Sequence, residues 1–139
     1  MLDFATLEPP SSPNFYLVCP PHLCKAEVPQ GISPEFPVRA AVLRELLLKI
    51  LSREPHITMV AWNDDQMTCE FVLRSTIFKF PDRISIQFFR LGQHRSTLAV
   101  YSRAIFGRYD FGANKRRLER WLDQLSRDAR RKSVANGAP

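Results

Sequence analysis

The chain has 139 residues, of which 45% are hydrophobic and 24% are charged, and its formal net charge is +6. That length is typical of one globular domain and that composition supports a buried core, so a wholly disordered chain is excluded. No run of about 18 apolar residues is present, which excludes a membrane-spanning helix.

The N-terminal part of the chain is rich in proline. Six of the eleven prolines lie within residues 1–30. Proline interrupts helices and sheet ladders, so we predict an extended arm over residues 1–32 with one strand-like run at 15–18. The first residues lack the basic and apolar regions of a signal peptide, so the chain as it stands predicts a cytoplasmic protein. If an anchor has been removed from this end, we instead expect a periplasmic or membrane-associated protein.

A first helix is predicted after this arm. Pro37 suits the first turn of a helix, and Pro55 marks the end of the helical pattern. Between them, apolar residues recur at helical spacing, namely Ala40, Leu43, Leu46, Leu47, Ile50 and Leu51. The spacing therefore predicts an amphipathic helix that buries one wide face.

Four strand-like runs follow the first helix. They cover residues 56–62, 68–74, 83–91 and 97–102, and residues 76–80 extend the second run past a bulge. Short polar turns between neighbouring runs predict an antiparallel meander. Alternation along the runs places Cys69, Phe71, Ile86 and Val100 on one face.

The opposite face of these strands is not purely polar. It is expected to carry Val60, Trp62, Val72, Phe89 and Tyr101 beside Glu70, Arg74 and Arg103. Apolar side chains on both faces call for a cover on each, and we expect the chain itself to cover this one.

A second helix is predicted to begin near Asp110, whose carboxylate can accept hydrogen bonds from the free amides of the first turn. One face of this helix collects Phe111, Asn114, Leu118, Trp121, Leu122 and Leu125. Between residues 115 and 132, eight basic and three acidic residues give a net charge of +5, so this helix supplies nearly all the excess positive charge. Residues 132–139 are predicted to form a frayed tail.

Together these elements predict an α+β fold. We expect a two-layer sandwich in which an antiparallel meander of four to five strands is flanked by an N-terminal and a C-terminal helix. At least one helix is expected to pack on the face that carries Cys69 and Val100. The domain is predicted to span residues 33–131, between the arm and the tail.

The segment from residue 102 to residue 117 resembles the signature of a known family. The matching residues are Ser102, Arg103, Gly107, Asp110, Phe111, Gly112, Asn114 and Arg117, and the match continues upstream through Arg74-Ser75, Phe80-Pro81-Asp82 and Pro13-Asn14. These positions are similar to domain-of-unknown-function family 1499, a bacterial family with plant relatives. The resemblance implies an uncharacterised role and relatives that often carry an N-terminal anchor or export signal. Members commonly have arginine two residues before the glycine, where this chain has Ile105.

Asn114 is the residue of this segment that most needs an explanation. Its position lies within the apolar stripe of the helix, and a buried amide without partners costs about 1–3 kcal/mol. One interpretation is structural: Asn114 ties the loop of residues 103–110 to the helix through backbone hydrogen bonds. The other is functional: the helix start forms a polar pocket, where arginines and the helix dipole favour an anion.

On the functional interpretation, a ligand site forms where five residues converge, namely Arg74, Arg103, Asp110, Asn114 and Arg117. Arg117 has an alternative structural role, because it lies beside the apolar stripe. We expect it to form an ion pair with Glu70 or Asp82, or else to reach the ligand.

The remaining groups of candidate residues do not predict a metal site, a catalytic site or a phosphate-binding loop. Cys19 and Cys24 flank His22, but zinc needs four ligands and no second close pair exists, so the cysteines are either bridged in an exported chain or free. The three histidines lie far apart in sequence, and none has a nucleophile context. The glycines are not grouped into a phosphate-binding loop. We therefore predict no metal, no cofactor and no catalytic residue.

Three functions are compatible with these observations. The leading hypothesis is a non-enzymatic binding or accessory module, which takes an anionic ligand or a protein partner at the start of the second helix. The alternative is electrostatic binding of nucleic acid or an anionic membrane through the basic helix. Interleaved acidic residues and the lack of an exposed aromatic pair argue against nucleic acid. The third hypothesis is an enzyme with an unrecognised site.

Overall fold

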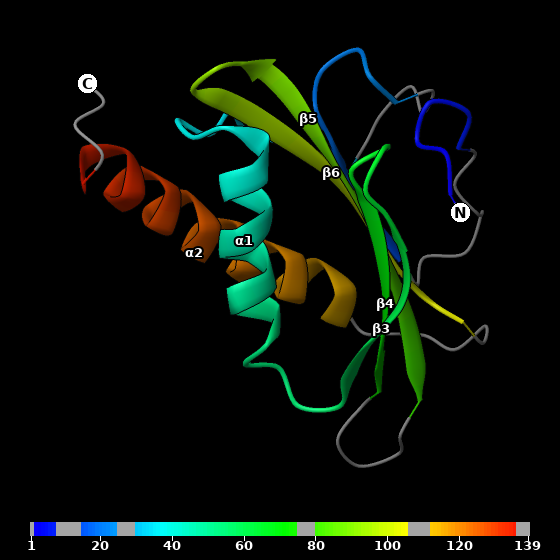
Figure 1. The fold of residues 1–139 in the computed structure, drawn as a ribbon. Helices are drawn as coiled ribbons and strands as arrows, with labels where there is room; N and C mark the ends of the chain where they lie inside the picture. The colour runs from blue at the N-terminus through cyan, green and yellow to red at the C-terminus, as the bar shows by residue number, and fades with distance from the viewer. Residues whose placement is uncertain (1, 8–14, 25–29, 75–79, 106–111, 136–139) are drawn as a thin grey trace.

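The described strands form one six-stranded mixed sheet, and two helices cover one of its faces (Figure 1). The computed structural model describes residues 2–7, 15–24, 30–74, 80–105 and 112–135. In chain order the elements are β1 (Phe15–Cys19), β2 (Gly31–Ile32), α1 (Ala40–Leu51), β3 (Ile57–Asn63), β4 (Thr68–Arg74), β5 (Pro81–Gly92), β6 (Arg95–Ala104) and α2 (Ala113–Ala135). Across the sheet the strands follow the order β2-β1-β6-β5-β4-β3.

The α+β class is confirmed, and so is the antiparallel meander, which β3 to β6 form. The predicted number of strands is wrong, because β1 and β2 extend the sheet beyond β6. β1 is antiparallel to β6 whereas β2 is parallel to β1, which makes the sheet mixed. β2 has only two residues in a proline-rich stretch, too few to show a strand periodicity.

The predicted domain boundary after residue 32 coincides with the end of β2, and the predicted boundary after residue 131 falls within α2. The predicted arm supplies β1 and β2, and Leu17 of β1 lies opposite Tyr101 of β6. At the other end, α2 continues to Ala135, because Ala129 and Ser133 extend its buried stripe. In the described part of the chain, the arm and the start of the tail are therefore built into the same fold as the rest.

The main core lies between the two helices and the sheet. Alternate residues of β4, β5 and β6 meet the apolar stripes of the helices, as the alternation predicted. Its buried residues include Leu43, Leu47 and Leu51 of α1, Leu118, Trp121 and Leu125 of α2, and Cys69, Phe71, Ile86 and Val100 of the sheet. The expectation that a helix packs on the face of Cys69 and Val100 is confirmed for both helices.

A second apolar cluster lies on the opposite face of the sheet, which we call the outer face. The N-terminal segment, residues 2–7, packs against strands β1 and β6 there. We call this group the N-terminal cluster, and its buried members are Phe4, Leu7, Leu17, Cys19, Ala99 and Tyr101. The chain thus covers this part of the outer face itself, as expected.

Trp62 was expected on the outer face and lies instead on the helix side. A β-bulge between Met59 and Ala61 shifts the register of β3, so that Trp62 pairs with Cys69. The Arg44 guanidinium of α1 lies 5.0 Å from the centre of the Trp62 ring. A bulge inserts one residue into the alternation, and period-2 counting along the sequence does not anticipate it.

A disulfide joins Cys19 at the end of β1 to Cys24, and both residues belong to the N-terminal cluster or pack against it. Of the two states expected for this pair, the structure has the bridged one.

Replacing both cysteines with serine is expected to lower the free energy of unfolding by about 2 kcal/mol, because the bridge closes a short loop. Chemical denaturation with and without dithiothreitol measures this loss in the wild type. The double-serine variant should not respond to dithiothreitol, and equal stability of the oxidised and reduced wild type would contradict the prediction.

Candidate functional site

Polar side chains gather on the helix side of the sheet where α2 begins. Oδ1 of Asn114 accepts hydrogen bonds from Ser102 Oγ at 2.5 Å and from Arg117 Nη1 at 2.8 Å. Arg117 Nη1 also lies 3.1 Å from Asp82 Oδ2, so the expected ion pair with Asp82 is confirmed. We call Asp82, Ser102, Asn114 and Arg117 the inner cluster. All four side chains are buried or nearly so, since only 13% of the Arg117 side chain is exposed.

The inner cluster supports the structural interpretation of Asn114. Its fully buried amide oxygen joins a donor on β6, Ser102, to a donor on α2, Arg117. The last strand and the last helix are thereby held together at the point where one leads into the other. These two donors are side chains, and most of the predicted backbone partners, in residues 103–110, lie outside the residues that the structure describes.

A surface cleft of about 290 Å³ lies beside the inner cluster, where the residues after α1 and the end of β4 meet the start of α2. We call it the basic cleft, and it is lined by Arg74, Arg116, Arg117 and Arg120 together with Glu54, Pro55, Leu73 and Ala113. The structure thus brings two predicted site residues, Arg74 and Arg117, to one cleft. A third, Asn114, binds Arg117 from the interior.

The basic cleft carries more positive than negative charge. Among its described lining residues Glu54 is the one acid, and its Oε1 accepts hydrogen bonds from Arg120 Nη2 at 2.5 Å and Trp121 Nε1 at 2.6 Å. Four guanidinium groups around one carboxylate that already has donors produce a positive field, which favours an anion. The described lining contains no serine, cysteine or histidine that could serve as a nucleophile.

The other two predicted site residues do not join the basic cleft. Asp110 lies outside the residues that the structure describes. Arg103 follows Ser102 along β6, and consecutive residues of a strand point to opposite faces of the sheet. Ser102 faces the helices, so Arg103 lies on the outer face. The described residues therefore do not converge on one site as predicted.

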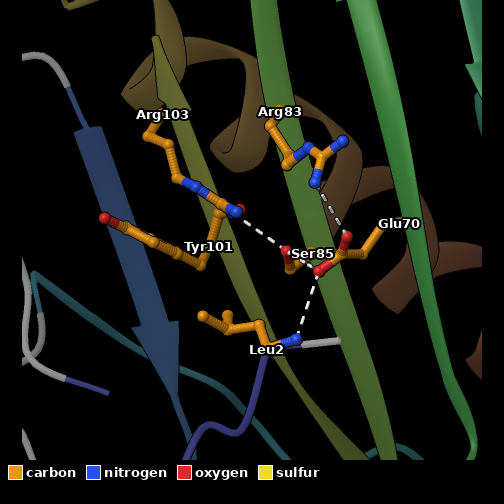
Figure 2. Close-up of polar contacts among 6 residues, drawn as sticks. All are labelled: Leu2, Glu70, Arg83, Ser85, Tyr101 and Arg103. Carbon is orange, nitrogen blue, oxygen red and sulfur yellow. Dashed lines mark hydrogen bonds and ion pairs between the residues drawn. The ribbon is translucent and has the colours of Figure 1, made fainter. Parts of the chain in front are cut away.

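Arg103 belongs to a second polar group, which lies on the outer face and is shown in Figure 2. Ser85 Oγ donates to Glu70 Oε1 at 2.9 Å, Arg103 Nη1 donates to Ser85 Oγ at 2.9 Å, and Arg83 Nη1 lies 3.3 Å from Glu70 Oε2. The backbone N–H of Leu2 also donates to Glu70 Oε1, at 3.4 Å. We call this group the outer cluster, which consists of Glu70, Arg83, Ser85, Tyr101 and Arg103.

Burial shapes the electrostatics of the outer cluster. Removal from water disfavours the charged form of a group, so it raises the pKa of Tyr101 and lowers the pKa of Arg103. Each of these two residues partly offsets the shift of the other. The Arg103 guanidinium lies 4.4 Å from the centre of the Tyr101 ring, in the geometry of a cation–π contact.

Arg83 and Ser85 were not predicted as members of a site. The alternation along each strand already placed Glu70 and Arg103 on one face. Their connection depends on the pairing of three strands, in which Glu70 lies opposite Ser85 and Ser85 lies opposite Tyr101. Alternation within a strand does not reveal the register between strands, so the sequence carried no signal for this network.

Cys69 is a packing residue. Burial raises the pKa of its thiol to about 12, so the thiol stays protonated and is a poor nucleophile. Across the part of the chain that the structure describes, no three His, Cys, Asp or Glu side chains are grouped as metal ligands.

The exposed side of α2 carries both signs of charge. Lys115 Nζ lies 3.9 Å from Glu119 Oε1, and Arg131 Nη1 lies 3.8 Å from Asp128 Oδ1. Such exposed pairs add little stability, but they reduce the positive field of the helix surface. Among the described residues, neither helix combines the length and the apolar character that crossing a bilayer requires.

The fold and these clusters define a small α+β protein with a buried polar network on each face of its sheet and a basic cleft beside one of them. Over residues 19–125 the chain matches a family described as "Protein of unknown function (DUF1499)". The chain belongs to this family, which confirms the resemblance of the segment from residue 102 to residue 117. No curated protein and no solved structure matches the chain.

Proposed function

We propose that this protein is a non-enzymatic binding module whose basic cleft takes an anionic ligand. The observation that carries the proposal is the lining of the cleft, with four arginines and one carboxylate that already accepts two hydrogen bonds. Guanidinium groups match carboxylate and phosphate oxygens with paired hydrogen bonds, which makes arginine the usual residue for recognising these anions.

The inner cluster supports this role because it orients one of the arginines that line the cleft. Arg117 lines the cleft, and its guanidinium is oriented by Asp82 and Asn114. A guanidinium that is already held in place loses less conformational entropy when it binds a ligand than one that is free to move. Ala113, the first residue of α2, also lines the cleft, so the positive end of the helix dipole lies at the same place.

The proposal is tested by calorimetric titration of the full chain with inorganic pyrophosphate, using Arg74→Gln and Arg116→Gln. Each substitution removes one positive charge from the cleft and is expected to weaken binding about tenfold, the effect of losing one charge-assisted hydrogen bond. Arg130→Gln is the matched control, because it removes the same charge from an exposed position of α2 outside the cleft.

Two results would contradict the proposal. One is the absence of binding to the wild type. The other is an equal loss of affinity in all three variants, with a steep dependence on salt concentration. That pattern would favour diffuse electrostatic binding along α2, since such binding depends on total charge and not on a particular position.

A further inference from the structure

The outer face holds two arginines directly across from each other. Arg83 of β5 and Arg103 of β6 are paired in the antiparallel register. Side chains at such positions begin about 5 Å apart, and like charges placed there repel each other. An arrangement of this kind destabilises the sheet unless negative charge lies close to both groups.

The described chain supplies one carboxylate for these two guanidinium groups. Arg83 contacts it directly, since its Nη1 lies 3.3 Å from Glu70 Oε2. Arg103 reaches it only through Ser85, whose hydroxyl accepts from Arg103 and donates to Glu70 (Figure 2). Glu70 is 5% exposed and is fixed by three donors, so it lies beneath the guanidinium groups as part of the floor.

The two arginines remain within reach of solvent, unlike the carboxylate. The Arg83 side chain is 40% exposed, and Arg103 is half-buried. The ring of Tyr101 lies 4.4 Å from the Arg103 guanidinium and limits its movement. The N-terminal segment closes the other side of Glu70, where the Leu2 N–H binds it. An incoming group would therefore meet two oriented cations before it met the carboxylate.

We propose that Arg83 and Arg103 form an anion-binding clamp on the outer face, which takes a carboxylate or phosphate group of a ligand. This site is separate from the basic cleft, because the two lie on opposite faces of the sheet. Ser85 and Tyr101 act as positioning residues for Arg103, and Glu70 is the carboxylate that lies beneath the two guanidinium groups. The ligand supplies the second negative charge that the cluster lacks, and planar guanidinium groups can each donate two parallel hydrogen bonds to its oxygens.

The test is a titration of the full chain with sodium acetate and, separately, with sodium phosphate, followed by two-dimensional amide NMR. Binding at the clamp is expected to shift the amide signals of Ser85, Tyr101 and Arg103. Binding at the basic cleft is read independently from the amides of Ala113 and Arg116. The two salts distinguish a carboxylate from a phosphate as the preferred group.

Two substitutions are expected to act in opposite directions. Arg103→Gln should weaken the binding seen at the clamp about tenfold and leave the response at the cleft unchanged. Glu70→Gln should strengthen binding at the clamp about tenfold, because it removes the nearby negative charge that competes with the ligand. Arg116→Gln is the control, since Arg116 lines the cleft from α2, on the helix side of the sheet.

The opposite signs keep the proposal testable even if Arg103→Gln disrupts the fold. Glu70→Gln is nearly the same shape as the wild-type residue, and a gain of affinity cannot come from unfolding. If neither salt shifts the amide signals of the clamp, or if Glu70→Gln leaves binding at the clamp unchanged or weaker, the result contradicts the proposed clamp. If the basic cleft binds neither salt while the clamp binds, the result contradicts the proposed function and supports the clamp.

Discussion

Replacing Arg117 with leucine is expected to lower the free energy of unfolding by about 3–5 kcal/mol. Arg117 Nη1 lies 3.1 Å from Asp82 Oδ2, and the Asp82 side chain is 2% exposed. Without the guanidinium, the buried carboxylate loses this cation, and weaker pairing of a charge that lies away from water is costly. Urea denaturation followed by far-ultraviolet circular dichroism measures the change.

A double substitution separates loss of the ion pair from simple loss of packing. Adding Asp82→Asn to Arg117→Leu removes the buried negative charge, so the double variant is expected to be more stable than Arg117→Leu alone. Lys115→Leu, at an exposed position of the same helix, should change stability by less than about 0.5 kcal/mol. A double variant that loses as much as the two single changes added together would show that the ion pair is not what stabilises this junction.

Replacing Asn114 with alanine is expected to lower the free energy of unfolding by about 2–3 kcal/mol. Asn114 is fully buried, and its amide oxygen accepts from Ser102 at 2.5 Å and from Arg117 at 2.8 Å. Alanine removes this acceptor, so two buried donors lose a partner, and one of these donors, Arg117, is charged. A thermal melt of the wild type and the variant detects the loss as a lower melting temperature.

The matched control for this change is Gln124→Ala, which truncates another amide on the same helix. Gln124 is half-buried and donates to Asp128 at 2.8 Å, so its loss should cost less than about 1 kcal/mol. Asn114→Asp keeps an oxygen acceptor for Ser102 and Arg117 and is expected to retain more stability than Asn114→Ala. An unchanged melting temperature together with lost pyrophosphate binding would assign Asn114 to the ligand site instead.

The two arginines of the family signature illustrate how much of a site can be predicted from sequence. Arg103 and Arg117 flank one strand-to-helix junction, and the sequence suggested that they meet. The strand alternation places Arg103 on the outer face, whereas α2 brings Arg117, its fifth residue, onto the helix side. The alternation had already predicted Arg103 on the face of Glu70, and the structure confirms this placement. The predicted meeting of Arg103 with Arg117 disregarded that alternation.

Asn114 is a residue whose burial could be predicted from the sequence. Its place within the apolar stripe of α2 predicted burial and a need for partners, and the structure confirms the burial. Arg117 lies one helical turn from Asn114 and is within local reach, whereas Ser102 comes within reach only after β6 and α2 have packed, so this partner was not predictable. The same limit applies to Glu70 and Ser85, which lie on adjacent strands whose register no local pattern specifies.

By itself the sequence determined the α+β class, the two amphipathic helices, the four-strand meander and the buried position of Asn114. These features follow from periodicity and composition, which are local properties of the chain. Only the tertiary structure decided that β1 and β2 join the sheet, that residues 2–7 cover the outer face, and that Arg74 and Arg103 lie at separate sites. These outcomes depend on pairing and packing between segments distant in the chain, and such contacts form when the whole core is assembled.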